Sequence, residues 1–277
     1  MINLIIALPA EARPLIDRYK LRTRSSVGNF RLYQHNDMAL IVSGPGKIAA
    51  AAATALLCSQ TESNGTAWLN IGIGGHASMD TGSGRLAHSI SDQASDKRWY
   101  PPQVLDAAID SCAVISVDTA ENRYPQDAIY DMECSGYYPI ACRFASGELV
   151  QSYKIVSDNR EQAATTVTTA QCTQLIADRL DEIDTLVTAL ITMAQQHKQW
   201  HTLPDDLHAL RQRWHFTVSQ QHQLTELARR WQVMLPDRPL WLDSFASERS
   251  ASGVLQGLLQ HLNTLPARFT EQQDRHV

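Results

Sequence analysis

Short apolar runs that are rich in β-branched residues recur along the first half of the chain. The clearest are residues 2–7 (INLIIA), 38–43 (MALIVS) and 67–71 (AWLNI). A run that is apolar at successive positions is typical of a strand covered on both faces. Residues 48–57 are rich in alanine, the best helix former, and predict a helix between two of these runs. The alternation favours an α/β fold in which a mixed central sheet is flanked by helices.

Weaker patterns complete this framework. Further strands are expected at 30–34, 85–91, 113–117 and 149–156, and further helices at 11–19 and 134–145. The strands at 30–34 and 38–43 read as a hairpin, because the turn-forming pair Asn36-Asp37 lies between them.

The character of the chain changes after Asp158. Leucines and isoleucines at helical spacing predict one long helix over 169–198, and Pro204 prevents it from continuing. Two later helices are expected, at 217–234 and 254–262. We therefore expect an α/β domain at residues 1–198, followed by a C-terminal helical extension at residues 199–277.

Charge and composition exclude several classes of function. The net charge is −5 and the basic residues are scattered, so no nucleic-acid partner is expected. No apolar run approaches the roughly 18–20 residues that span a bilayer, and no basic segment precedes the first run, so we expect neither a membrane partner nor a signal peptide. The five cysteines lack C-x-x-C spacing, which predicts neither a disulfide framework nor a zinc site and favours a reducing, cytoplasmic location. No cofactor is expected.

Four histidines recur every seven residues in the expected extension, namely His201, His208, His215 and His222. Seven residues of helix rise by about 10 Å, whereas the ligand atoms of one zinc ion lie within about 2 Å of it. A shared metal site is therefore not expected, and a partly exposed helix seam is the preferred interpretation.

Two glycine-rich segments follow expected strands. The segment GIGGHA at 72–77 matches the G-x-G-x-x-A pattern of dinucleotide-binding loops, but that motif must open a helix. Here it runs into SMDTGSG and then a strand, so we favour a backbone that approaches another group closely. The segment SGPGK at 43–47 could cradle an anion at the start of the next helix or form a tight turn, and both interpretations stand equally.

Three acidic residues each end or follow an expected strand. The stretch at 128–136 (AIYDMECSG) passes from an apolar strand to Glu133, while Glu11 and Asp158 follow the strands at 2–7 and 149–156. A carboxylate at the end of a buried strand is costly unless something binds it, although Glu133 could also be a first-turn acid of the next helix. Open α/β sheets bind their ligands at such strand ends.

Several short motifs in this order resemble the nucleoside phosphorylase/nucleosidase family, and within it the methylthioadenosine/S-adenosylhomocysteine nucleosidases. The resemblance covers about residues 1–198. The motifs are ALPAE at 7–11, SGPGK at 43–47, the N-x-G-x-x-G loop at 70–75, YDME at 130–133 and VSD at 156–158.

The resemblance implies hydrolysis of the N-glycosidic bond of a purine nucleoside or of a 5′-modified relative such as methylthioadenosine. Glu11 would activate water and Asp158 would protonate the departing base, a task for general acid catalysis. The substrate-binding residues implied are Ile71, Gly72, Ile73, Gly75, Met132, Glu133 and Ser157, of which Glu133 would bind the ribose hydroxyls. No metal takes part, and a homodimer is expected, as in the family.

Glu11 separates the two chemistries of the family. The phosphorylases keep this position neutral, and a carboxylate here would repel a phosphate dianion, so hydrolysis is favoured. The sequence departs from the family pattern at two places. Lys154 replaces an arginine. The aromatic residue that stacks on the purine in the family has no clear counterpart, and Thr119 and Ala120 lie nearest to its position. A nucleosidase-fold protein that binds a nucleoside without turnover is the alternative function, and a purine nucleoside phosphorylase is the third.

Overall fold

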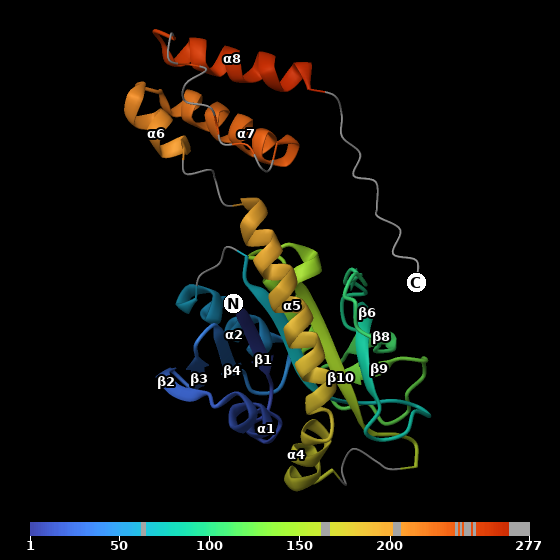
Figure 1. Ribbon diagram of the computed structural model, residues 1–277. Coiled ribbons are helices and arrows are strands. Elements are labelled where there is room, and N and C mark those ends of the chain that lie inside the picture. The colour runs from blue at the N-terminus through green and yellow to red at the C-terminus, as the bar shows by residue number, and fades with distance from the viewer. Residues whose placement is uncertain are drawn as a thin grey trace, which may run out of the picture. The chain divides into compact units, whose positions relative to one another are not determined.

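Figure 1 shows the computed structural model of the chain. It describes residues 1–61, 65–161, 167–201, 206–235 and 248–265, together with the single residues 238, 240 and 245. Residues 1–195 and 196–277 form two compact units, each with its own apolar core. Within the described residues, no helix is long and apolar enough to cross a membrane.

The first unit contains all the strands that the structure describes. They are β1 (Ile2–Ile6), β2 (Arg22–Val27), β3 (Phe30–His35), β4 (Met38–Val42), β5 (Ala67–Gly75), β6 (Gly84–Asp92), β7 (Arg98–Trp99), β8 (Ser111–Ser116), β9 (Ile129–Asp131) and β10 (Val150–Asp158). The helices that begin in this unit are α1 (Pro9–Tyr19), α2 (Lys47–Gln60), α3 (Cys134–Ala141), the 3-10 helix η1 (Gly147–Leu149), α4 (Thr169–Ala177) and α5 (Leu180–His201).

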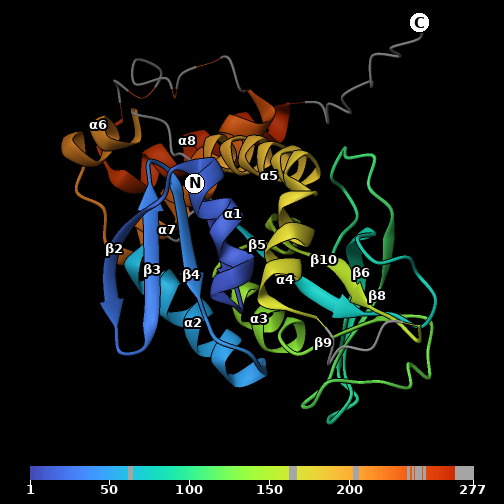
Figure 2. The same ribbon diagram turned by 90° about the horizontal axis from the view of Figure 1, so that it is seen from below.

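All these strands belong to one mixed sheet, as the sequence predicted. The strand order is β10-β6-β8-β9-β5-β1-β4-β3-β2, and β7 pairs with β6. Strand β1 is parallel to β4 and β5, whereas β3 is antiparallel to β4 and β10 is antiparallel to β6. A second pairing of β10, parallel to β5, closes β5, β9, β8, β6 and β10 into a ring. Figure 2 shows β2, β3 and β4 side by side at the open edge.

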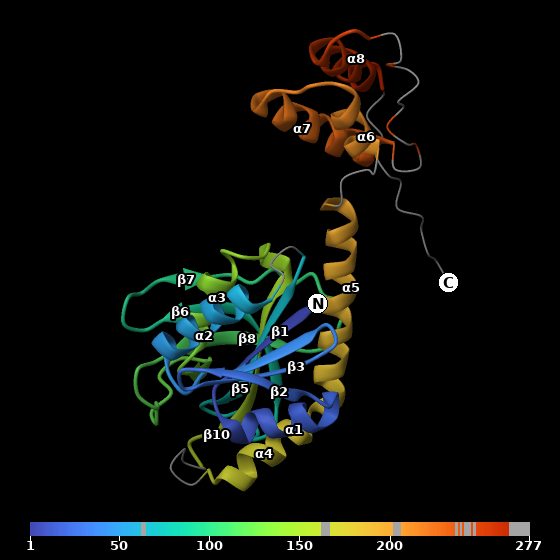
Figure 3. The ribbon, with the colours of Figure 1, turned by 90° about the vertical axis from the view of Figure 1, so that its left-hand side faces the viewer.

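Helices cover the sheet on both faces, which explains why its strands are apolar at successive positions. Figure 3 shows α2 and α3 on one side of the strands and α5 on the other. Ala50 and Ala53 of α2 are fully buried, because their short side chains let the helix lie close to the sheet. Ile176 of α4 and Leu186 of α5 pack into the cluster on the opposite face.

Helix α1 forms although Pro14 lies inside it. A proline in a helix leaves the carbonyl four residues earlier without its usual donor. Here that carbonyl belongs to Ala10, and the hydroxyl of Thr173 in α4 donates to it over 3.0 Å. The helix also starts earlier than expected, at Pro9, a residue suited to the first turn. As a result Glu11 is the third residue of the helix and not its first.

The prediction of a single helix over 169–198 is wrong. Two helices, α4 and α5, are separated by Asp178 and Arg179. The apolar residues keep helical spacing across the break, so periodicity could not reveal it. Arg179 is held by a tertiary contact, since its Nε donates to the carbonyl of Gly82 over 2.6 Å.

The prediction that the strand ends at residue 71 and a glycine loop follows is also wrong, because β5 continues to Gly75. Strand β10 pairs along this stretch, with Lys154 opposite Gly72 and Val156 opposite Gly74. A Cβ on Gly74 would lie 2.7 Å from Cγ2 of Ile129, so glycine permits strand β9 to approach. Strand β2 and helix α6 (Asp206–Arg213) were not expected, since both are short and polar.

The second unit is helical, with α7 (Val218–Met234) and α8 (Ala251–Thr264) beside α6. Its core includes Trp214, Trp231 and Leu258. The indole of Trp231 stacks on His261 with ring centroids 5.0 Å apart. Across the described part of the chain, no three or more His, Cys, Asp or Glu side chains are grouped so that they could hold a metal ion.

Candidate active site

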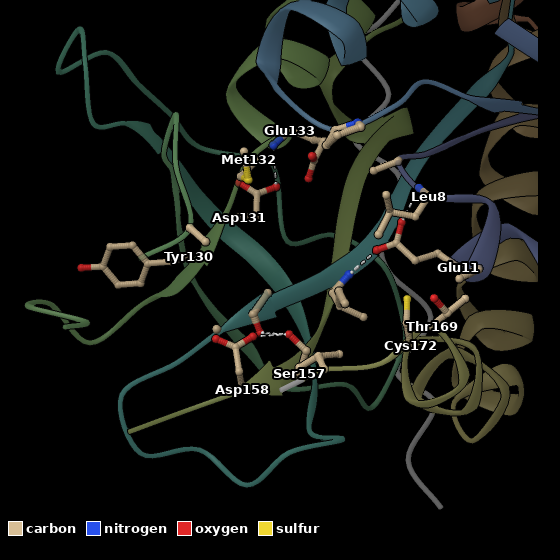
Figure 4. A pocket seen from close by; sticks show the side chains of 18 of the residues that line it. Leu8, Glu11, Tyr130, Asp131, Met132, Glu133, Ser157, Asp158, Thr169 and Cys172 are labelled. Atoms are coloured by element: carbon tan, nitrogen blue, oxygen red, sulfur yellow. Dashed lines mark hydrogen bonds between the residues drawn. The ribbon is translucent and has the colours of Figure 1, made fainter. Parts of the chain in front are cut away.

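A cavity of about 500 Å³ lies where β1, β5, β9 and β10 end. Its wall includes Glu11 from the first turn of α1, Glu133 two residues after β9, and Asp158, the last residue of β10. Figure 4 shows these three carboxyl groups around the same hollow, although their residues lie far apart in the sequence. The volume is within the usual range of sites for small organic ligands.

Glu11 is held by two backbone N–H groups. Oε2 accepts a hydrogen bond from Leu8 N over 2.8 Å, and Oε1 accepts one from Ile73 N over 2.9 Å. The side chain is almost completely buried. Burial raises the pKa of Glu11 above its ordinary value, although the two N–H groups and the charge of Lys154 partly offset the increase. A carboxyl group with a raised pKa is suited to accept a proton from water.

Glu133 lies on the other side of the cavity and reaches the start of α2. Its Oε1 accepts a hydrogen bond from Gly46 N over 2.9 Å, and Gly46 is the N-cap of that helix. The SGPGK segment therefore binds a carboxyl group, and that group is a side chain of the same protein. Burial raises the pKa of Glu133 to about 7, against the opposing charge of Lys154.

A buried ion pair lies beside Glu133. Nζ of Lys154 is 2.8 Å from Oδ2 of Asp131 and 3.9 Å from Oε2 of Glu133. Asp131 also accepts hydrogen bonds from the hydroxyl of Ser116 over 2.6 Å and from Cys134 N over 2.8 Å. Burial alone would raise the pKa of Asp131, but the charge of Lys154 lowers it below the ordinary value. Asp131 is therefore ionised and fixed, and it holds the turn that carries Glu133.

Asp158 has a hydroxyl donor on each oxygen. Ser157 donates to Oδ1, and the phenol of Tyr124 donates to Oδ2. The carboxyl group is nearly buried and follows a bulge that shifts the pairing of β10 with β5. Burial and the bond to Asp158 raise the pKa of Tyr124, so its phenol remains protonated and acts as a donor.

Most of the residues expected from the sequence line this cavity. Those that do are Glu11, Ile73, Gly75, Met132, Glu133, Ser157 and Asp158. Ile71 and Gly72 are not among its described lining residues: the side chain of Ile71 lies in the apolar core, and Gly72 lies against Glu11 and Lys154.

The sequence analysis did not identify three residues that contact the expected site residues. They are Asp131, Lys154 and Tyr124. Asp131 stood in the YDME motif without a role, and Lys154 was noted only as a departure from the family pattern. Tyr124 lies in an irregular segment, where no local pattern could connect it with a residue 34 positions later. Thr169 and Cys172 of α4 complete the wall near Glu11.

Comparisons with known proteins identify the fold. No protein-family model matches the chain, and no curated protein sequence matches it either. Among solved structures, futalosine hydrolase of Helicobacter pylori has a TM-score of 0.56 at 13% identity, over 68% of this chain and 97% of that one. A Streptococcus pneumoniae methylthioadenosine/S-adenosylhomocysteine nucleosidase, solved with a transition-state inhibitor, has a TM-score of 0.53 at 17% identity, over 68% and 99%. The first unit therefore has the nucleosidase fold, and the resemblance read from the motifs is confirmed at that level.

Proposed function

We propose that this protein hydrolyses the N-glycosidic bond of a purine nucleoside or of a 5′-modified nucleoside of the methylthioadenosine type. One observation carries the proposal: the three acids that the chemistry needs line one cavity, although they come from positions 11, 133 and 158. The Streptococcus pneumoniae nucleosidase with this fold acts on methylthioadenosine and S-adenosylhomocysteine, as its name states. The proposal includes the catalytic roles of Glu11 and Asp158 that the motifs imply.

Each acid has a distinct task. Glu11, with a raised pKa, takes a proton from water as the water attacks C1′ of the sugar. Glu133 binds the ribose hydroxyls and stabilises the positive charge that develops on the sugar. Asp158 gives a proton to a ring nitrogen of the purine, and the electron pair of the broken C1′–N bond goes to the base. Apolar neighbours such as Ile73 and Met132 limit the access of bulk water.

The charge of the cavity favours water over phosphate as the nucleophile. Five acidic residues line it, namely Glu11, Glu121, Asp131, Glu133 and Asp158, and no Lys or Arg is among its described lining residues. The nearest cation, Lys154, is already paired with Asp131. A phosphate dianion would therefore enter an acidic cavity without a counter-charge, which costs several kcal/mol at separations of about 4 Å.

Release of free base from adenosine, inosine and methylthioadenosine in phosphate-free buffer tests the proposal. We expect release by the wild-type protein and a loss of about 10²–10⁴-fold in Asp158→Asn, the usual contribution of a general acid. Asp17→Asn, which changes an exposed acid on α1, is the matched control and keeps the wild-type rate.

Other outcomes identify the competing functions. Tight binding by calorimetry without any product would show a nucleoside-binding protein, and release only after phosphate is added would show a phosphorylase. The dimer implied by the resemblance is part of the proposal, and light scattering during size-exclusion chromatography measures it.

A further inference from the structure

Tyr124 contacts the base-protonating acid from outside the cavity. Its phenol donates a hydrogen bond to Oδ2 of Asp158, while Tyr124 itself is not among the described lining residues. The ring is nearly completely buried, and its edge packs against Tyr130 with centroids 5.8 Å apart. The hydroxyl is therefore fixed, and it faces the carboxyl group and not the solvent.

The backbone around Tyr124 is arranged to bring about this contact. Tyr124 has φ +46°, in the left-handed region that residues other than glycine seldom adopt and that the surroundings must enforce. Nη2 of Arg160 donates to the carbonyl of Tyr124 over 3.1 Å. The last residue of β10 and the segment after it therefore hold Tyr124 at two points, through Asp158 and through Arg160.

Gly75 leaves the space in which the two side chains meet. A Cβ at this position would lie 2.6 Å from Cε1 and 2.7 Å from the hydroxyl oxygen of Tyr124, and it would also collide with Asp158. Real Cβ atoms do not come so close, so any other residue at this position would separate the pair. The end of β5 thus serves the contact as well as the cavity wall.

We propose that Tyr124 is a positioning residue for the protonation of the purine, and that it acts through Asp158. This inference rests on the proposed function. In the step itself, the O–H bond of Asp158 breaks, an N–H bond forms on the purine, and the C1′–N electron pair moves to the base. A carboxylate can accept several hydrogen bonds, so the hydroxyls of Tyr124 and Ser157 keep their places and stabilise the negative charge that forms. Tyr124 gives up no proton.

Tyr124→Phe tests the inference with two substrates, because it removes the hydroxyl and keeps the ring. The first is the best purine nucleoside, whose base must be protonated to leave. The second is p-nitrophenyl β-D-ribofuranoside, whose leaving group departs as an anion without protonation. We expect kcat for the nucleoside to fall by about tenfold or more, the effect of a hydrogen bond to a charged group, with KM little changed. The rate with the nitrophenyl riboside remains that of the wild type.

A second tyrosine–aspartate pair provides a control. Tyr19→Phe is the matched control, because Tyr19 also donates to an aspartate, Asp184, over 2.7 Å but lies outside the described cavity wall. It leaves the leaving-group selectivity unchanged.

The possible failures can be told apart. Equal losses with both substrates, or an unchanged rate with the nucleoside, would overturn the role of Tyr124 without contradicting the proposed hydrolase activity. If the wild-type protein cleaves neither substrate, the proposed function fails and the role of Tyr124 fails with it.

Discussion

Lys154 and Asp131 form an ion pair, 2.8 Å from Nζ to Oδ2, in which both side chains are almost completely removed from solvent. Taking two charges out of water is costly, and a partner left alone in the interior is more costly than the pair. The pair lies beside Glu133 and fixes the turn after β9. Stability and site geometry are therefore coupled here.

Lys154→Met should destabilise the first unit by about 3–5 kcal/mol, because it leaves the carboxylate of Asp131 buried without a counter-charge. Chemical denaturation measures the loss. The double variant Lys154→Met/Asp131→Asn should recover most of it, since residue 131 then carries no charge that needs a partner. Arg13→Ala, which breaks an exposed ion pair with Asp17, is the control and should leave the midpoint almost unchanged. A Lys154→Met midpoint equal to that of the control would contradict this reading of the pair.

Stability should fall as the pH rises through the range in which Glu133 titrates. The pKa of Glu133 is about 7 in the folded protein, above its ordinary value of 4.5, because the side chain is buried. Between these two values the folded protein keeps a proton that the unfolded chain has released, so the free energy of unfolding decreases with rising pH. Burial raises the pKa of Glu11 too, which adds to the same slope.

Glu133→Gln should flatten this slope, and denaturation midpoints from pH 4.5 to 8 measure it. The variant should also be more stable than the wild type at pH 8, where the wild-type side chain carries a buried charge. Asp17→Asn, an exposed acid on α1, should keep the wild-type slope. Identical slopes in Glu133→Gln and wild type would show that this carboxyl group does not titrate as described.

Gly136→Ala should destabilise the first unit by about 1–3 kcal/mol, although alanine is the better helix former. A Cβ at this position of α3 would lie 2.6–2.7 Å from the carbonyl carbon and Cα of Lys47 and would collide with its carbonyl oxygen. The collision displaces the start of α2 and with it the N–H of Gly46 that binds Glu133. We therefore expect a higher KM for nucleosides as well.

Gly147→Ala provides the matched control for that substitution. The nearest atoms to a Cβ on Gly147 are 3.7 Å away in Pro102, an ordinary van der Waals distance. Its denaturation midpoint and KM should stay close to the wild-type values. If both glycine variants behave alike, the close contact between α2 and α3 is not the cause of the loss of stability or of the higher KM.

Glu11→Gln should lower kcat by about 10²–10⁴-fold for purine nucleosides and for p-nitrophenyl riboside alike, because water must be activated with either leaving group. Asp158→Asn, in contrast, should slow only the nucleosides. The side-chain NH2 group of the glutamine would also face a backbone N–H group, that of Leu8 or of Ile73. Two donors cannot form a hydrogen bond with each other, and this should cost about 1–3 kcal/mol of stability. Steady-state rates with both substrates check the prediction, and a selective loss in Glu11→Gln would assign the residue to the base.

Local patterns in the sequence were sufficient for the mixed α/β fold and for the three acids of the candidate site. Runs such as residues 2–7 predict a strand covered on both faces wherever they occur, because burial depends on which side chains are adjacent. The same reasoning failed at the break between α4 and α5, since a tertiary hydrogen bond from Arg179 holds it. It also failed at Gly75, where pairing with β10 extends the strand.

Only the tertiary structure decided which partners the acids have. The phenol of Tyr124 and the ammonium group of Lys154 reach their carboxylates from 34 and 23 positions away, through strand pairing and a left-handed turn that no local pattern contains. The sequence by itself determined that acids stand at the strand ends. Packing determined their orientation, because neighbouring donors hold each carboxyl group, and burial raised the pKa of Glu11 and Glu133.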